Sequence, residues 1–216
     1  MNKKNKGGGS SSLDKIIQTM DQTELPLDAP AKSYGACSYS AEFTTTALGK
    51  KLSRCKDVIG TIKRDSAIHV VSAAEWSAEH MIAAIADQLS PADLMFATWS
   101  ASDASLSRLC AAMSSGAIRS CRAIVDWRVK VRKPNAYTML RSALQSCDLR
   151  LTSCHAKVYL LSGNEMHVSI VSSANLTSNP RIEASVITES KAVYDFHKSW
   201  MDAEINNAKP FDEASK

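Results

Sequence analysis

Short apolar segments of strand length alternate with amphipathic segments of helix length through the middle of this chain. Strand-like segments occur at residues 67–73, 94–98 and 117–127, and helix-like segments at residues 77–89, 104–113 and 137–146. This order predicts parallel strands joined by right-handed crossovers, because a strand that returns to the same sheet in the same direction needs a long connection. The sequence therefore predicts an α/β fold. A further strand is expected at residues 182–188 and a closing helix at 192–206.

Two more strand-like segments, residues 155–161 and 166–172, are separated by the turn-forming residues Ser-Gly-Asn-Glu. This arrangement predicts an antiparallel hairpin that joins the sheet. Residues two apart in a strand point to the same face. We therefore expect His155 and Lys157 to share one face, Ser173 and Asn175 to share another, and both pairs to meet at one end of the hairpin.

The four side chains suit chemistry on a phosphodiester. An imidazole can attack phosphorus as a nucleophile, while ammonium, hydroxyl and amide donors stabilise the negative oxygens of the transition state. Such a reaction needs no metal ion and no other cofactor. The remaining histidines also lack Cys, Asp or Glu partners at metal-site spacing, so the sequence predicts a metal-independent site.

The order His-x-Lys, Ser-x-Asn and then Glu resembles the HKD signature of the phospholipase D superfamily, and most closely that of its small bacterial endonucleases, which carry one motif per chain. The resemblance implies a phospholipase D-like mixed sheet flanked by helices on both faces. It also implies that His155 is the nucleophile and that Lys157 and Asn175 bind phosphate. Ser173 matches the serine of the family's Gly-Ser-x-Asn element, and Glu183 matches the acid that holds the nucleophilic histidine.

A single copy of the motif has a mechanistic consequence. Attack on phosphorus and protonation of the leaving oxygen need groups on opposite sides of the phosphate, and one histidine cannot occupy both places. We therefore expect a homodimer in which His155 of one subunit attacks and the same residue of the second subunit protonates the leaving group.

Basic residues gather in the stretch from 117 to 150, where eight Lys and Arg residues stand against two Asp, a net charge of +6. A local excess of this kind favours binding to a phosphate backbone through release of counterions. Arg128, Lys130 and Arg132 follow a predicted strand at the end where α/β folds bind ligands, and Trp99 follows the neighbouring strand. The four are predicted to bind the substrate, with nucleic acid, DNA or RNA, as the partner.

The segments outside the motif suggest a simple organisation. Residues 1–35 are expected to form a flexible, basic, Gly/Ser-rich leader with a short helix at 13–20, residues 36–206 the phospholipase D-like domain, and residues 207–216 a tail. The six cysteines show no Cys-x-x-Cys spacing, which favours a reducing compartment. With no signal-peptide pattern and no apolar run of membrane-spanning length, we predict a cytoplasmic protein that does not bind membranes.

Two other functions remain open on the sequence. Ser162 stands where the family has Asp, and Ser172 where it has Gly, so a non-catalytic module that binds nucleic acid or protein is one alternative. A phospholipid phosphodiesterase, which uses the same catalytic groups, is the other. The sequence favours the nuclease because it shows no amphipathic membrane-surface helix and no second motif.

Overall fold

The computed structural model describes residues 42–45, 55–72, 76–143, 147–177 and 181–208. The chain separates into two units, Met1–Gly35 and Ala36–Lys216, and all of these residues belong to the second. The predicted leader, with its helix at 13–20, lies outside the described residues, as do residues 209–216 of the predicted tail.

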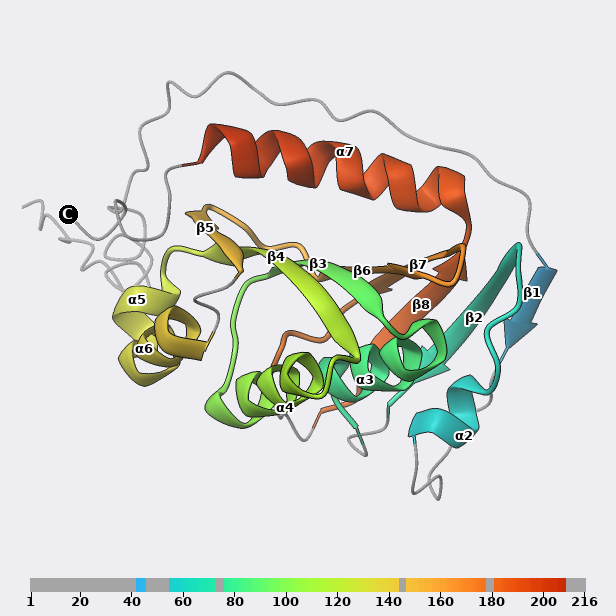
Figure 1. The fold of residues 1–216 in the computed structure, drawn as a ribbon. Coiled ribbons are helices and arrows are strands. Elements are labelled where there is room, and N and C mark those ends of the chain that lie inside the picture. Colours follow the sequence, from blue (N-terminus) through green and yellow to red (C-terminus); the bar gives the residue numbers. More distant parts are fainter. Residues whose placement is uncertain (1–41, 46–54, 73–75, 144–146, 178–180, 209–216) are drawn as a thin grey trace, which may run out of the picture. The chain divides into compact units, whose positions relative to one another are not determined.

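Strands and helices alternate in the first half of the described part of the chain, and four successive strands precede the last helix (Figure 1). The strands are β1 (Glu42–Thr45), β2 (Ser66–Val71), β3 (Ala92–Thr98), β4 (Ile118–Asp126), β5 (Asp148–Thr152), β6 (Val158–Gly163), β7 (Met166–Ser172) and β8 (Ala184–Glu189). The helices are α2 (Cys55–Ile59), α3 (Ala78–Leu89), α4 (Asp103–Ser114), α5 (Val129–Arg132), α6 (Pro134–Ala143) and α7 (Lys191–Asn207).

The strands form one mixed sheet in the order β1-β2-β8-β7-β6-β3-β4-β5. The predicted parallel arrangement is confirmed for β3 and β4, and β5 adds a further parallel pair with β4. The parallel direction also holds for β2, which pairs in parallel with β1, but three strands separate β2 from β3, so these two do not pair. The crossover through α3 skips these three positions, and the later hairpin and β8 fill them through antiparallel ladders.

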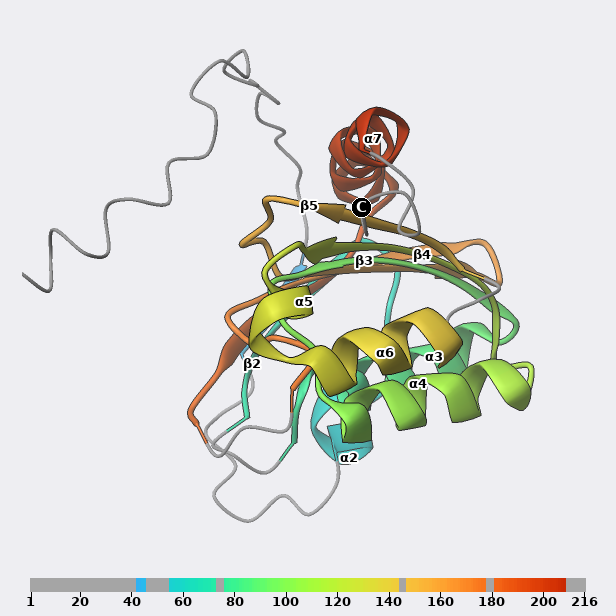
Figure 2. The ribbon, with the colours of Figure 1, turned by 90° about the vertical axis from the view of Figure 1, so that its left-hand side faces the viewer.

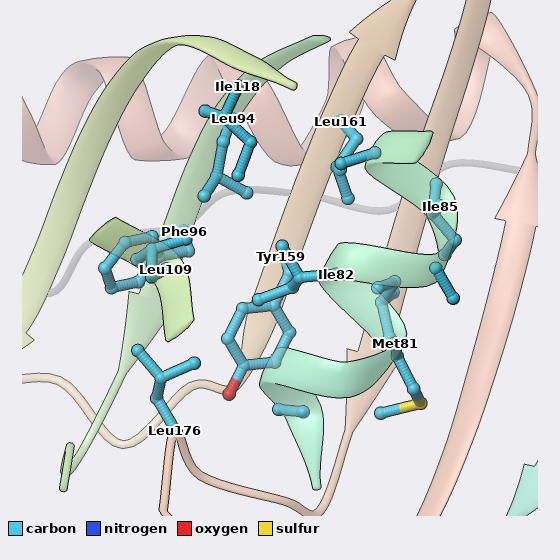
Figure 3. Packing of buried hydrophobic residues seen from close by; sticks show 14 of the residues in the cluster. Met81, Ile82, Ile85, Leu94, Phe96, Leu109, Ile118, Tyr159, Leu161 and Leu176 are labelled. Atoms are coloured by element: carbon cyan, nitrogen blue, oxygen red, sulfur yellow. The ribbon is translucent and has the colours of Figure 1, made fainter. Parts of the chain in front are cut away.

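Helices cover both faces of the sheet, as predicted. Helices α2, α3, α4 and α6 lie on one face and α7 lies on the other (Figure 2). On the first face, Met81, Ile82 and Ile85 of α3 pack near Tyr159 and Leu161 of β6 (Figure 3). On the second face, buried residues of α7 pack against those of β3, β4 and β6. This second cluster includes Met95, Ile124, Leu160, Tyr194, Met201 and Ile205.

The predicted hairpin is confirmed. Strands β6 and β7 pair in antiparallel register from Val158 opposite Val171 to Gly163 opposite Met166. The two residues that connect them, Asn164 and Glu165, have φ angles of 47° and 59°. Two consecutive residues with positive φ are what a tight two-residue hairpin turn requires, and asparagine tolerates this conformation better than most residues.

Several boundaries differ from the predictions. Strand β6 begins at Val158, so His155 and Lys157 lie in the segment before it, which has no regular secondary structure, rather than within the strand. Strand β8 begins at Ala184, two residues later than expected. The elements β1, α2, α5 and β5 were not predicted, because segments of four or five residues are too short to display a hydrophobic period.

Gly163, the last residue of β6, allows a close approach of two backbones. A Cβ atom there would lie deep inside van der Waals contact with the Leu89 carbonyl oxygen and 3.1 Å from that of Pro91. We expect Gly163→Ala to lower the free energy of unfolding by about 1–3 kcal/mol, because backbone must move to admit the methyl group. Urea denaturation measures this change. Ser107→Ala, exposed on α4, is the control and should change stability by less than about 0.5 kcal/mol; an equally small change for Gly163→Ala would contradict the expectation.

Candidate active site

The hairpin places the two polar pairs at the same end. The backbone N–H of Ser172 donates to the carbonyl oxygen of Lys157 at 3.0 Å, one step beyond the last pair of the β6–β7 ladder. His155 and Lys157 therefore immediately precede β6 while Ser173 and Asn175 immediately follow β7. This end of the hairpin lies beside the end of β3, because Ala97 of β3 pairs with Val158.

His155 is exposed and contacts two neighbouring side chains. The Nζ of Lys157 lies 3.4 Å from each ring nitrogen of His155 and donates a 2.7 Å hydrogen bond to its carbonyl oxygen. The ring of Trp99 lies 5.6 Å from the imidazole, centroid to centroid, at an interplanar angle of 58°. The imidazole is thus accessible to a substrate, and an ammonium group stands next to it.

The pKa of Lys157 lies below its ordinary value. Partial burial is the main cause, because it disfavours the charged form, while the nearby Cys154 and Glu183 act in the opposite direction. A phosphate placed beside this ammonium would favour its protonated form again.

Ser173 and Glu183 form a pair. The Ser173 hydroxyl donates to the Glu183 carboxylate and accepts a 3.1 Å hydrogen bond from the Ala184 backbone N–H. Sequence reasoning assigned Glu183 to His155, whereas the side-chain hydrogen bond that Glu183 makes in the described part of the chain is with Ser173. The charge of Glu183 nonetheless acts on Lys157, so the carboxylate lies close to the polar cluster.

Asn175 lies in the loop after β7, which three hydrogen bonds fix. The buried Tyr159 hydroxyl donates to the carbonyl oxygen of Ala174 at 2.8 Å. On the other side of Asn175, the Leu176 N–H donates to Ser100 O at 3.1 Å, and Ser102 N–H donates to Leu176 O at 2.8 Å. The Oδ1 of Asn175 is buried without a hydrogen-bond partner among the described residues.

Sequence reasoning missed Tyr159 and Asp126, two buried residues whose side chains hold the backbone beneath the site. Asp126, at the end of β4, is fully buried and accepts hydrogen bonds from Arg128 Nε at 2.7 Å and Nη2 at 2.8 Å. It also accepts from the Cys154 backbone N–H at 3.0 Å, which fixes the residue before His155. The only sequence signal was an acidic residue that ends an apolar strand two residues before an arginine.

The two residues that depart from the family pattern make structural contacts. The Ser162 hydroxyl accepts a 3.1 Å hydrogen bond from Tyr194 of α7, and Ser162 lies roughly 16 Å from Lys157 at about 3.3 Å per strand residue. The Ser172 hydroxyl lies 2.7 Å from that of Ser185 and accepts from the Ala174 N–H at 2.9 Å. Both serines therefore support the hairpin.

A cationic cavity of about 200 Å³ adjoins the polar cluster. Its lining residues are Trp99, Ser100, Arg128, Val129, Arg132, Lys133, Asn175, Thr177 and Arg181. Of the predicted substrate-binding residues, Trp99, Arg128 and Arg132 belong to this lining, whereas Lys130 lies elsewhere on α5. The Arg132 guanidinium lies 5.7 Å from the centre of the Trp99 ring, a cation–π distance, so Trp99 contacts both Arg132 and His155.

The arrangement of the strands and helices is that of the phospholipase D fold. A search of family models and a search of curated protein sequences each found no match. Among solved structures, the chain is similar to Nuc from Salmonella typhimurium, a phospholipase D family member, with 18% identity and a TM-score of 0.52 over 67% of this chain and 97% of that one. It is also similar to NucT from Helicobacter pylori, with 12% identity and a TM-score of 0.53 over 67% of this chain and 99% of that one. The fold that the motif implied is therefore confirmed.

The described residues were also compared with the requirements of a metal site and of a membrane-spanning helix. They contain no group of three or more His, Cys, Asp or Glu side chains arranged to hold a metal ion. None of their helices is both long enough and apolar enough to cross a membrane.

The buried Asp126 carboxylate makes the stability of the fold depend on pH. Burial raises its pKa, but the hydrogen bonds from Arg128 and Cys154 lower it by more, so the folded-state pKa lies below the ordinary value. A lowered carboxyl pKa stabilises the fold at pH values above the unfolded pKa of about 4, and this contribution is lost as the pH falls through the folded-state pKa. We expect Asp126→Asn to be less stable than the wild type at pH 7 and this difference to shrink as the pH falls below about 4.

Thermal or urea unfolding between pH 7 and pH 3 measures this difference. Asp103→Asn, exposed at the start of α4, is the matched control and should follow the wild type. A stability difference for Asp126→Asn that stays constant across this pH range would contradict the role assigned to the Asp126 carboxylate.

Proposed function

We propose that this chain is a metal-independent nuclease that cleaves DNA or RNA phosphodiesters through a phosphohistidine at His155. The observation that carries the proposal is the convergence of His155, Lys157, Ser173 and Asn175 at one end of the β6–β7 hairpin, beside a cavity lined by cations. The phospholipase D fold supports it, because the motif that these residues resemble belongs to the same superfamily.

In the first step, a ring nitrogen of His155 attacks phosphorus, and the bond between phosphorus and the leaving oxygen breaks. Lys157 and the Asn175 amide bind the phosphate oxygens, and the Ser173 hydroxyl adds a third donor. Glu183 holds Ser173 in place and, when His155 turns toward it, accepts the second ring N–H, which fixes the tautomer. In the second step, water attacks phosphorus and the histidine is released.

The leaving oxygen needs a proton, and the attacking water must lose one. We propose that both transfers use His155 of a second copy of the chain, brought opposite the first by a twofold axis. The exposure of His155 is consistent with this arrangement, because the imidazole has neighbours on its own chain but is not enclosed by them.

A binding module without turnover is the second candidate, since Ser162 and Ser172 replace an Asp and a Gly of the motif. The contacts of both serines favour the nuclease: each supports the hairpin, and Ser162 is remote from the phosphate-binding end. Turnover separates the two candidates.

We expect the purified protein to cleave single-stranded DNA, double-stranded DNA or RNA in excess EDTA. His155→Ala should lower kcat/KM by about 10³-fold or more, because it removes the nucleophile, and Lys157→Ala by about 10²-fold. His69→Ala, an exposed histidine on β2, is the matched control and should keep wild-type activity. Cleavage that survives the His155 change would refute the nucleophile assignment, and binding without cleavage would favour the second candidate.

A shared active site predicts how subunits behave in mixtures. When wild type and His155→Ala are mixed in equal amounts and allowed to exchange, only dimers with two wild-type subunits should turn over. The activity of the mixture should then be about one quarter of the activity of wild type alone at the same total protein concentration. If each subunit acted alone, it would be about one half. Steady-state rates after subunit exchange measure this ratio, and a linear dependence on the wild-type fraction would contradict the shared site.

A further inference from the structure

The cations around the cavity fall into two groups. Arg128 is neutralised, since its guanidinium makes two hydrogen bonds to the buried carboxylate of Asp126. The other three, Arg132, Lys133 and Arg181, are exposed and have no acidic partner within the described part of the chain. The cavity is therefore a concave surface with an excess of unpaired positive charge, and no carboxylate lines it.

This cavity is next to the proposed reaction centre. Asn175, which is expected to bind the scissile phosphate, is also one of the lining residues. Trp99 forms the other connection, because its ring lies 5.6 Å from the His155 ring and 5.7 Å from the Arg132 guanidinium. A group bound in the cavity would thus be a direct neighbour of the group bound at His155.

The volume of the cavity and the cationic groups that line it suit a small anion. Its volume of about 200 Å³ lies below the roughly 300–1,000 Å³ typical of sites that enclose a drug-sized ligand. Guanidinium groups bind phosphate oxygens through two parallel hydrogen bonds, and Lys133 adds a compact charge. The hydroxyls of Ser100 and Thr177 supply further donors.

We propose that the cavity binds the phosphate adjacent to the scissile one, through Arg132, Lys133 and Arg181. This inference rests on the proposed nuclease function and names its substrate class: an oligonucleotide with at least two successive phosphodiesters, not a phospholipid with one. Arg128 is then a positioning residue that holds the cavity wall to Asp126, rather than a phosphate ligand.

A second groove adjoins the cavity. It shares Arg132 and Lys133 with the cavity and continues past the first residues of α4 and α6. Its volume is about 550 Å³, so a further nucleotide of the strand has room beyond the second phosphate.

The test compares thymidine dinucleotide, which has one phosphodiester, with thymidine trinucleotide, which has two. In EDTA, the wild type should cleave the trinucleotide with a kcat/KM about 10-fold or more above that for the dinucleotide, because only the trinucleotide fills both phosphate sites. In the double variant Lys133→Ala/Arg181→Ala this ratio should fall to about two, the statistical advantage of two cleavable bonds. Lys63→Ala, an exposed lysine before β2, removes one charge elsewhere and should keep the wild-type ratio.

Arg132 needs its own variant because it also stacks on Trp99. Arg132→Lys keeps the charge and removes the planar group, so we expect an intermediate ratio. Both changed residues of the double variant are exposed, and an unchanged melting temperature will establish that it folds. A double variant that keeps the wild-type ratio would overturn the second phosphate site.

Binding separates this inference from the proposed function. If the wild type cleaves neither these oligonucleotides nor longer DNA or RNA, the nuclease proposal fails, and the affinities of the same two ligands then decide on the cavity. Binding of the trinucleotide about 10-fold tighter than the dinucleotide, with the difference lost in the double variant, supports the second site. Equal affinities overturn it, and so does hydrolysis of phosphatidylcholine vesicles without cleavage or binding of either oligonucleotide.

Discussion

The antiparallel pairing of β6 with β7 is the constraint on which the site depends. The two-residue turn at Asn164 and Glu165 fixes the register, and the register in turn fixes which residues emerge at the opposite end. Because side chains in a strand alternate between faces, a slip by one residue would reverse the orientation of every side chain in one strand. The bond from Ser172 N–H to Lys157 O carries that register up to the first polar pair.

The surrounding sheet converts this local arrangement into a site. Antiparallel pairing of β6 with β3 brings the end of β3 beside His155, and Trp99 and Ser100 follow that strand directly. Parallel pairing of β3 with β4 adds Asp126 and the basic segment behind it. Two fully buried groups, the Tyr159 hydroxyl and the Asp126 carboxylate, then hold the backbone on either side of the motif. Catalytic side chains at a surface can be placed accurately only where the backbone beneath them is fixed in this way.

The hairpin and the order of the polar groups could be predicted from sequence because both are local. Turn-forming residues between two strand-like segments and a spacing of two residues are visible without any knowledge of tertiary structure. The position of β2 could not be predicted, since its separation from β3 depends on where the later strands β6, β7 and β8 insert. The strand β5 and helix α5 were too short to recognise.

The sequence also could not show which basic side chains are paired with carboxylates and which remain available to a ligand. Arg128 and Arg132 look alike in a charge count, yet Arg128 is paired with a buried carboxylate and Arg132 lies over the half-buried ring of Trp99. Burial of Asp126 decides this difference, and burial depends on the whole sheet rather than on neighbouring residues. Fewer side chains of residues 117–150 therefore carry unpaired positive charge than the count of basic residues suggests.

In the proposed reaction, His155 becomes covalently bound to phosphorus during turnover. The most direct measurement is mass spectrometry of the peptide that contains His155, after an oligonucleotide reaction in EDTA is stopped in alkali within the first turnover. We expect a nucleotidyl group on His155 that is stable in alkali, is lost in acid and disappears as the reaction reaches completion. Sustained cleavage with no adduct on His155 at any time, or with an adduct on another residue, would contradict it.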